Sequence, residues 1–160
     1  MTDAPTSPAA APLPLLPLLL AGLVGELAFE LYAWLISPLI FGPSLQPANL
    51  VIALTNIATG IKIPYAVAFP IHFLIGAVGF ALFFWLVHRL SGLSLILSGL
   101  VTGLILWFVA QGILAPVVGR DFMMGFGPYT QSSFVAHTGM CLLMAIALRG
   151  LLARSKPPLT

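Results

Sequence analysis

Long, nearly uninterrupted apolar runs dominate the chain. Four of them follow one another, at about 15–41, 65–87, 94–117 and 132–152. Each provides the roughly 20 residues that an α-helix needs to cross the ~30 Å hydrocarbon core of a bilayer. The runs lack the two-residue alternation of a barrel strand, and segments rich in proline and glycine separate them. The pattern therefore predicts an all-α protein, a four-helix transmembrane bundle with up-and-down connections.

The segments outside these runs are short. Residues 1–14 are rich in proline and alanine and predict a disordered cytoplasmic tail, and 153–160 predict a second one, so the membrane domain covers 15–152. No basic residue precedes the first run, which argues against a signal peptide. The first outer loop, Pro47 to Gly60, is apolar but too short to span. Proline at its start and glycine at its end favour a short helix that lies in the membrane interface or dips into the bilayer.

The composition supports this architecture and excludes several function classes. Of the 160 residues, 60% are hydrophobic and 6% are charged, whereas soluble domains carry about 25% charged residues. The lipid bilayer is thus the expected partner, with a homo-oligomer or a larger membrane complex as further options. The few, scattered basic residues do not form a nucleic-acid footprint. No phosphate loop, nucleophile elbow or HExxH motif occurs in the sequence, so no enzyme is predicted.

The basic residues that flank the four runs predict an orientation. With four spans, both termini and the loop between spans two and three share one side. That side carries four basic residues, Arg89, Arg149, Arg154 and Lys156. The opposite side carries Lys62 and Arg120. Because cytoplasmic loops of membrane proteins carry an excess of Lys and Arg, both termini are expected in the cytoplasm.

Two acidic residues interrupt the first run. Glu26 and Glu30 are one helical turn apart and therefore share a face, with Glu30 near the membrane midplane. Two neighbouring carboxylates cannot both stay ionised in lipid without a cation. They indicate a proton or cation site, and the alternative is a protonated carboxyl that is hydrogen-bonded within the bundle.

Three polar residues are expected at similar depth in the other spans. His72 and His137 lie near the outer ends of spans two and four, and Gln111 lies at a comparable level in span three. Together they predict one outer-facing polar pocket. Haem or metal ligation by the two histidines is a less favoured alternative, and a neutral histidine that donates to a carbonyl or to Glu30 is another. No cofactor is predicted.

Two further patterns admit a functional and a structural interpretation. His137, Cys141 and Met144 share a face of span four, and soft ligands of this kind suit Cu(I), although such residues more often pack in a core. Arg120 and Asp121 are interpreted as a self-paired surface couple. The alternative makes them the entrance of a polar cavity that includes Gln111 and His137.

The glycines of spans two and three permit close helix contacts. Gly99 and Gly103 form a G-x-x-x-G pattern, and Gly76 and Gly79 follow His72 by about one and two turns. The pattern leaves open whether these contacts form within one bundle or between copies.

Several of these residues together resemble the YagU-type family of small bacterial inner-membrane proteins. The resemblance covers Pro47 to Leu152 and rests on Pro47-Ala48-Asn49, His72-x-x-x-Gly76, Gly99-x-x-x-Gly103 with Pro116, and His137. It implies a location in the cytoplasmic membrane, an association with acid tolerance and no established catalytic residues.

Three function classes follow. The first is a non-enzymatic bundle whose buried Glu/His site handles protons or a small solute, or serves in membrane stress. The second is an accessory or assembly subunit of a larger membrane complex, and the third is a haem- or metal-binding redox protein.

Overall fold

The computed structural model describes residues 13–42 and 45–154, and within them every regular element is a helix. Four helices are long and apolar enough to cross a membrane: Leu15–Phe41, Tyr65–Ser91, Leu95–Val117 and Pro128–Arg154. These four apolar helices confirm the helical class and the number of candidate spans. Most of the two predicted tails, residues 1–12 and 155–160, lies outside the described residues.

The first three long helices each contain a π-helical turn. The first consists of α1 (Leu15–Leu31), η1 (Tyr32–Ile36) and α2 (Ser37–Phe41); the second of α4 (Tyr65–Leu74), η2 (Ile75–Phe80) and α5 (Ala81–Ser91); the third of α6 (Leu95–Phe108), η3 (Val109–Leu114) and α7 (Ala115–Val117). The fourth is one uninterrupted helix, α8 (Pro128–Arg154). The connections contain a short apolar helix, α3 (Ala48–Thr59), and the 3₁₀ segment η4 (Phe122–Phe126).

Two of the π-helical turns end just before a proline. η1 ends two residues before Pro38, and η3 ends two residues before Pro116. A proline inside a helix donates no N–H and its ring crowds the preceding turn, and a wider turn relieves this crowding. η2 has no proline of its own but contains Gly76 and Gly79. Each of the three turns displaces the face that the following helical segment presents.

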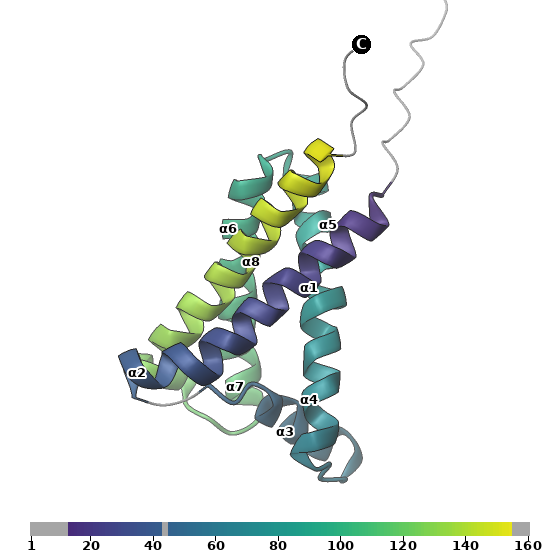
Figure 1. Ribbon diagram of the computed structural model, residues 1–160. Coiled ribbons are helices and arrows are strands. Elements are labelled where there is room, and N and C mark those ends of the chain that lie inside the picture. The colour runs from purple at the N-terminus through teal and green to yellow at the C-terminus, as the bar shows by residue number, and fades with distance from the viewer. Residues whose placement is uncertain (1–12, 43–44, 155–160) are drawn as a thin grey trace, which may run out of the picture.

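Helix α8 lies between α1 and α6, and glycines allow both contacts (Figure 1). A Cβ atom added to Gly25 of α1 would lie 3.0 Å from the Met140 carbonyl oxygen of α8. On the other side, a Cβ on Gly99 of α6 would lie 2.7 Å from the Cys141 carbonyl oxygen, and one on Gly103 would lie 2.7 Å from Thr138 Cα. The G-x-x-x-G pattern of span three therefore serves packing within this chain.

The start of α1 and the end of α8 lie at the same end of the molecule, and α2, α3 and α7 lie at the other (Figure 1). Two buried clusters fill the interior between these ends. One contains Leu18, Phe84 and Leu148, and the other contains Phe29 and Leu106. Many leucines and isoleucines on the outside of the long helices are exposed, as expected for a surface that faces lipid.

Candidate functional site

The two acidic residues of α1 face the interior of the bundle. Glu26 is fully buried and Glu30 is 7% exposed. They share the buried face of α1 with Gly22, Gly25 and Phe29, as their spacing of one helical turn requires. The carboxyl groups are thus enclosed by protein, and this arrangement avoids the cost of an acidic side chain in lipid.

His72 of α4 completes a three-residue cluster with these acids. Its Nδ1 atom lies 3.4 Å from Glu26 Oε1 and 3.3 Å from Glu30 Oε1. One ligand atom from each of the three residues lies within 4.8 Å of the other two. Among the residues that the structure describes, this is the one group of three or more His, Cys, Asp or Glu side chains close enough to hold a metal ion. We call Glu26, Glu30 and His72 the acid–histidine cluster.

Gly76 makes room for the buried carboxylate. A Cβ atom at this position in η2 would collide with the Glu26 carboxyl group. A neighbouring contact sets the distance between the two helices, since a Cβ on Gly22 of α1 would collide with the Ala77 carbonyl of η2. Two glycines on facing helices thus bring α1 and η2 together and leave a gap that the Glu26 side chain occupies.

The polar atoms of the acid–histidine cluster are poorly satisfied. The indole Nε1–H of Trp34 donates a hydrogen bond to Glu30 Oε2, with 3.0 Å between the two atoms. Four other buried atoms form no hydrogen bond with any described residue, namely both oxygens of Glu26, Glu30 Oε1 and His72 Nδ1, although His72 Nδ1 lies within ion-pair distance of Glu26 Oε1 and Glu30 Oε1. Buried polar groups are rarely left in this state, and each such group calls for an explanation.

His137 belongs to a separate hydrogen-bond network on α8. Its Nδ1 atom lies 2.7 Å from the Ser133 carbonyl oxygen and therefore carries the proton that it donates. Gln111 Nε2 of η3 donates to the Ser133 hydroxyl over 3.0 Å, and the Thr130 hydroxyl donates to Gln111 Oε1 over 3.2 Å. His137 therefore donates to a carbonyl, as one of the sequence-based alternatives expected.

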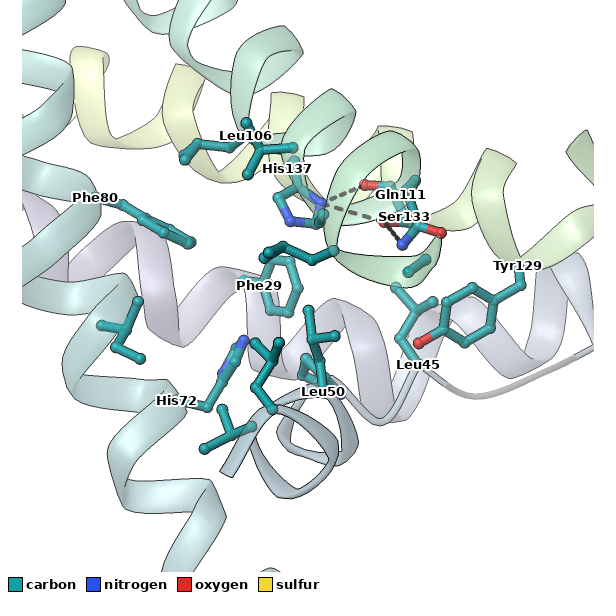
Figure 2. A pocket seen from close by; sticks show the side chains of 18 of the residues that line it. Phe29, Leu45, Leu50, His72, Phe80, Leu106, Gln111, Tyr129, Ser133 and His137 are labelled. Carbon is teal, nitrogen blue, oxygen red and sulfur yellow. Dashed lines mark hydrogen bonds between the residues drawn. The ribbon is translucent and has the colours of Figure 1, made fainter. Parts of the chain in front are cut away.

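A cavity of about 180 Å³ lies between the two polar groups (Figure 2). His72, Gln111 and His137 all line it, so the three residues expected at one depth do share one cavity. The ring of Phe29 lies between the two imidazoles, with ring centroids 5.8 Å from His72 and 5.3 Å from His137. The remaining wall is mostly apolar, including Leu50 and other residues of α3. The expected polar pocket is therefore an apolar cavity with a few polar groups.

The soft ligand candidates of α8 pack in the core. Cys141 and Met144 are both fully buried, and each belongs to one of the two hydrophobic clusters. This placement accords with the packing interpretation of the His137, Cys141 and Met144 stripe.

The sequence anticipated only some of the residues that form the site. Arg120 lines the cavity together with Gln111 and His137, which favours its interpretation as part of a cavity over that of a surface couple. Phe29, Trp34 and Tyr129 are ordinary aromatic residues in the sequence, and only their neighbours in space give them a role. Gly76 carried a signal, since it follows His72 by one turn, but the sequence does not indicate that Glu26 lies against it.

No protein-family model matches the chain, and searches of curated proteins and of solved structures find no significant match.

Proposed function

We propose that this chain is a small, non-enzymatic, multi-pass protein of the bacterial inner membrane that binds a small solute in the cavity between His72 and His137. The observation that supports this proposal is the cavity itself, which is mostly apolar and has a few convergent polar groups. Binding sites for small molecules have this composition. The location in the cytoplasmic membrane follows the resemblance to the YagU-type family.

The size and chemistry of the cavity limit the solute. Apolar cavities of about 150 Å³ accept a molecule such as benzene, and this one measures about 180 Å³. Because Nδ1 of His137 donates to Ser133, a neutral imidazole keeps Nε2 as an acceptor. A compact molecule with an apolar body and one hydroxyl donor fits these features.

Phenol is a suitable probe, with benzene as its counterpart without the hydroxyl. We expect phenol to raise the unfolding temperature of the detergent-purified protein in a saturable way, because a ligand of the folded state stabilises it. Phenol should bind about fivefold more tightly than benzene, since one net hydrogen bond contributes about 1 kcal/mol. Ala110 lines the cavity, and Ala110→Phe should abolish the phenol-dependent shift by filling it.

A matched control separates cavity binding from effects of phenol on the micelle. Val78→Phe adds a comparable ring on the exposed side of η2, where Val78 is 38% exposed. This variant should respond to phenol as the wild type does. An equal response of wild type and Ala110→Phe would show that phenol acts elsewhere and would remove the support for a solute site.

The proposed arrangement in the membrane is up-and-down, with both termini in the cytoplasm. The basic residues support it, because Arg89, Arg149 and Arg154 would lie on the cytoplasmic side. Helix α3 would then lie in or near the outer interface and close the cavity from that side. Fusions at Thr160 should be active with a cytoplasmic reporter, and fusions at Gly125 with a periplasmic one. Cytoplasmic activity of the Gly125 fusion would reverse the orientation.

A further inference from the structure

The acid–histidine cluster has the geometry of a metal site. Tetrahedral zinc with bonds of about 2.0–2.2 Å to oxygen and nitrogen places its ligand atoms about 3.3–3.6 Å apart. His72 Nδ1 lies 3.4 Å from Glu26 Oε1 and 3.3 Å from Glu30 Oε1. These two distances match, and one ligand atom from each of the three side chains lies within 4.8 Å of the other two, so the side chains converge on a common centre.

The electrostatics of the cluster favour a divalent cation. Two carboxylates and a neutral imidazole carry a charge of minus two, and one divalent ion neutralises it. A neutral assembly matters here because an unbalanced charge is expensive inside the bilayer. The ion would also bind three of the four buried atoms that form no hydrogen bond, namely one Glu26 oxygen, Glu30 Oε1 and His72 Nδ1.

The surroundings of the cluster resemble the outer shell of a metal site. The Trp34 indole donates to Glu30 Oε2, the oxygen that does not face His72, and so holds this carboxylate in place. Hydrogen bonds of this kind to a ligating group orient it toward the metal. His72 also belongs to the wall of the cavity. Three protein ligands beside a cavity leave a position for a water molecule or a solute, as in zinc sites with an open coordination position.

We infer that Glu26, Glu30 and His72 bind one divalent first-row transition metal ion through two carboxylate oxygens and one imidazole nitrogen. Carboxylate oxygen and imidazole nitrogen ligands at these separations suit Zn²⁺, which is the probe used below. This site is distinct from the two-histidine ligation considered from the sequence, because the Phe29 ring lies between His72 and His137. The inference is also independent of the solute proposal, since zinc binding is measured without solute.

The test uses the full chain, purified in detergent without a polyhistidine tag, stripped with EDTA and reloaded with Zn²⁺. Elemental analysis after gel filtration should find about one zinc ion per chain. Competition with a chelating dye then gives the affinity of each variant. Glu26→Gln and Glu30→Gln keep the shape of the side chain but remove a charged ligand, and His72→Gln removes the imidazole. Each substitution should weaken zinc binding by about 10–100-fold or more. Even the loss of a residue that only hydrogen-bonds a metal ligand lowers metal affinity by about 10–100-fold.

His137→Gln is the matched control, because His137 lines the same cavity but lies outside the acid–histidine cluster. It should keep the wild-type zinc affinity. X-ray absorption on the zinc-loaded wild type gives a result that does not depend on any variant folding. It should show nitrogen and oxygen ligands with a single imidazole. Any of three results would overturn the inference: wild-type protein that retains no zinc, Gln variants of the cluster that bind zinc with wild-type affinity, or an absorption spectrum that shows sulfur or two imidazole ligands.

Discussion

Replacing Gly22 by alanine is expected to destabilise the protein by about 3 kcal/mol, the upper part of the usual range for overpacking. The added methyl group would collide with the Ala77 carbonyl of η2 and lie 2.8 Å from the Ala81 side chain. A backbone carbonyl cannot move aside as a flexible side chain can, so α1 and η2 must separate. Unfolding of the variant in mixed micelles, followed by circular dichroism, measures the loss.

Gly139→Ala provides the matched control within a helix of the same chain. Gly139 lies in α8, and a Cβ atom there would meet no atom within 4 Å. This variant should be as stable as the wild type or more stable by about 0.5–1 kcal/mol, because alanine favours the helix over glycine. Equal stabilities of the Gly22 and Gly139 variants would show that α1 and η2 do not pack as described.

The second large effect is expected from His72→Leu. In metal-free buffer with EDTA, this substitution removes the imidazole that lies within ion-pair distance of two buried carboxyl groups and leaves Glu26 and Glu30 close together without it. Removing one member of a buried charged pair typically costs about 3–5 kcal/mol. The same unfolding measurement should therefore show a loss of that size for His72→Leu.

A second substitution distinguishes this electrostatic cost from a packing defect. In the His72→Leu background, Glu26→Gln removes one of the two facing carboxyl groups and should recover part of the lost stability. His137→Leu, in contrast, removes a histidine whose Nδ1–H bonds only within its own network on α8, and it should cost about 1 kcal/mol. If Glu26→Gln lowers the stability of the His72→Leu protein further, the cluster is not held by opposite charge.

The apolar pattern of the sequence was sufficient to predict four long helices, because the length and hydropathy of a span are local properties. The residues at which the helices begin and end were harder to predict from the sequence. The second helix continues past Val87 to Ser91 and stops at Gly92, whose φ of +66° is favourable for glycine. The fourth helix begins at Pro128 rather than near Ser132, and proline is well tolerated in the first turn of a helix.

The site was predictable only in part, for a physical reason. The one-turn spacing of Glu26 and Glu30 predicts that they share a face, and the high cost of acids in lipid predicts that this face is buried. Their contact with His72 depends instead on which helices cross and at which residue. Gly22 and Gly76 set that crossing, but a glycine in a sequence does not identify its neighbour.

The π-helical turns add a second reason. A widened turn changes the rotation between residues before and after it, so a regular helical period does not predict which side chains face inward beyond that point. All three turns carry residues of the site: Trp34 lies in η1, Gly76 in η2 and Gln111 in η3. The sequence gives the positions of these three residues, but it does not predict that they face the same site.

The attachment of α3 has a consequence for the rate at which the cavity exchanges its contents. This helix contributes Leu50, Val51 and Leu54 to the cavity wall, yet most of its helix–helix contacts are with α4. Helices α1, α6 and α8 are instead joined by close glycine contacts. Opening of the cavity can therefore proceed by a local excursion of α3, while the glycine-packed helices stay together. Amide hydrogen exchange in α3 would then report the opening rate, and that rate could change without any change in global stability.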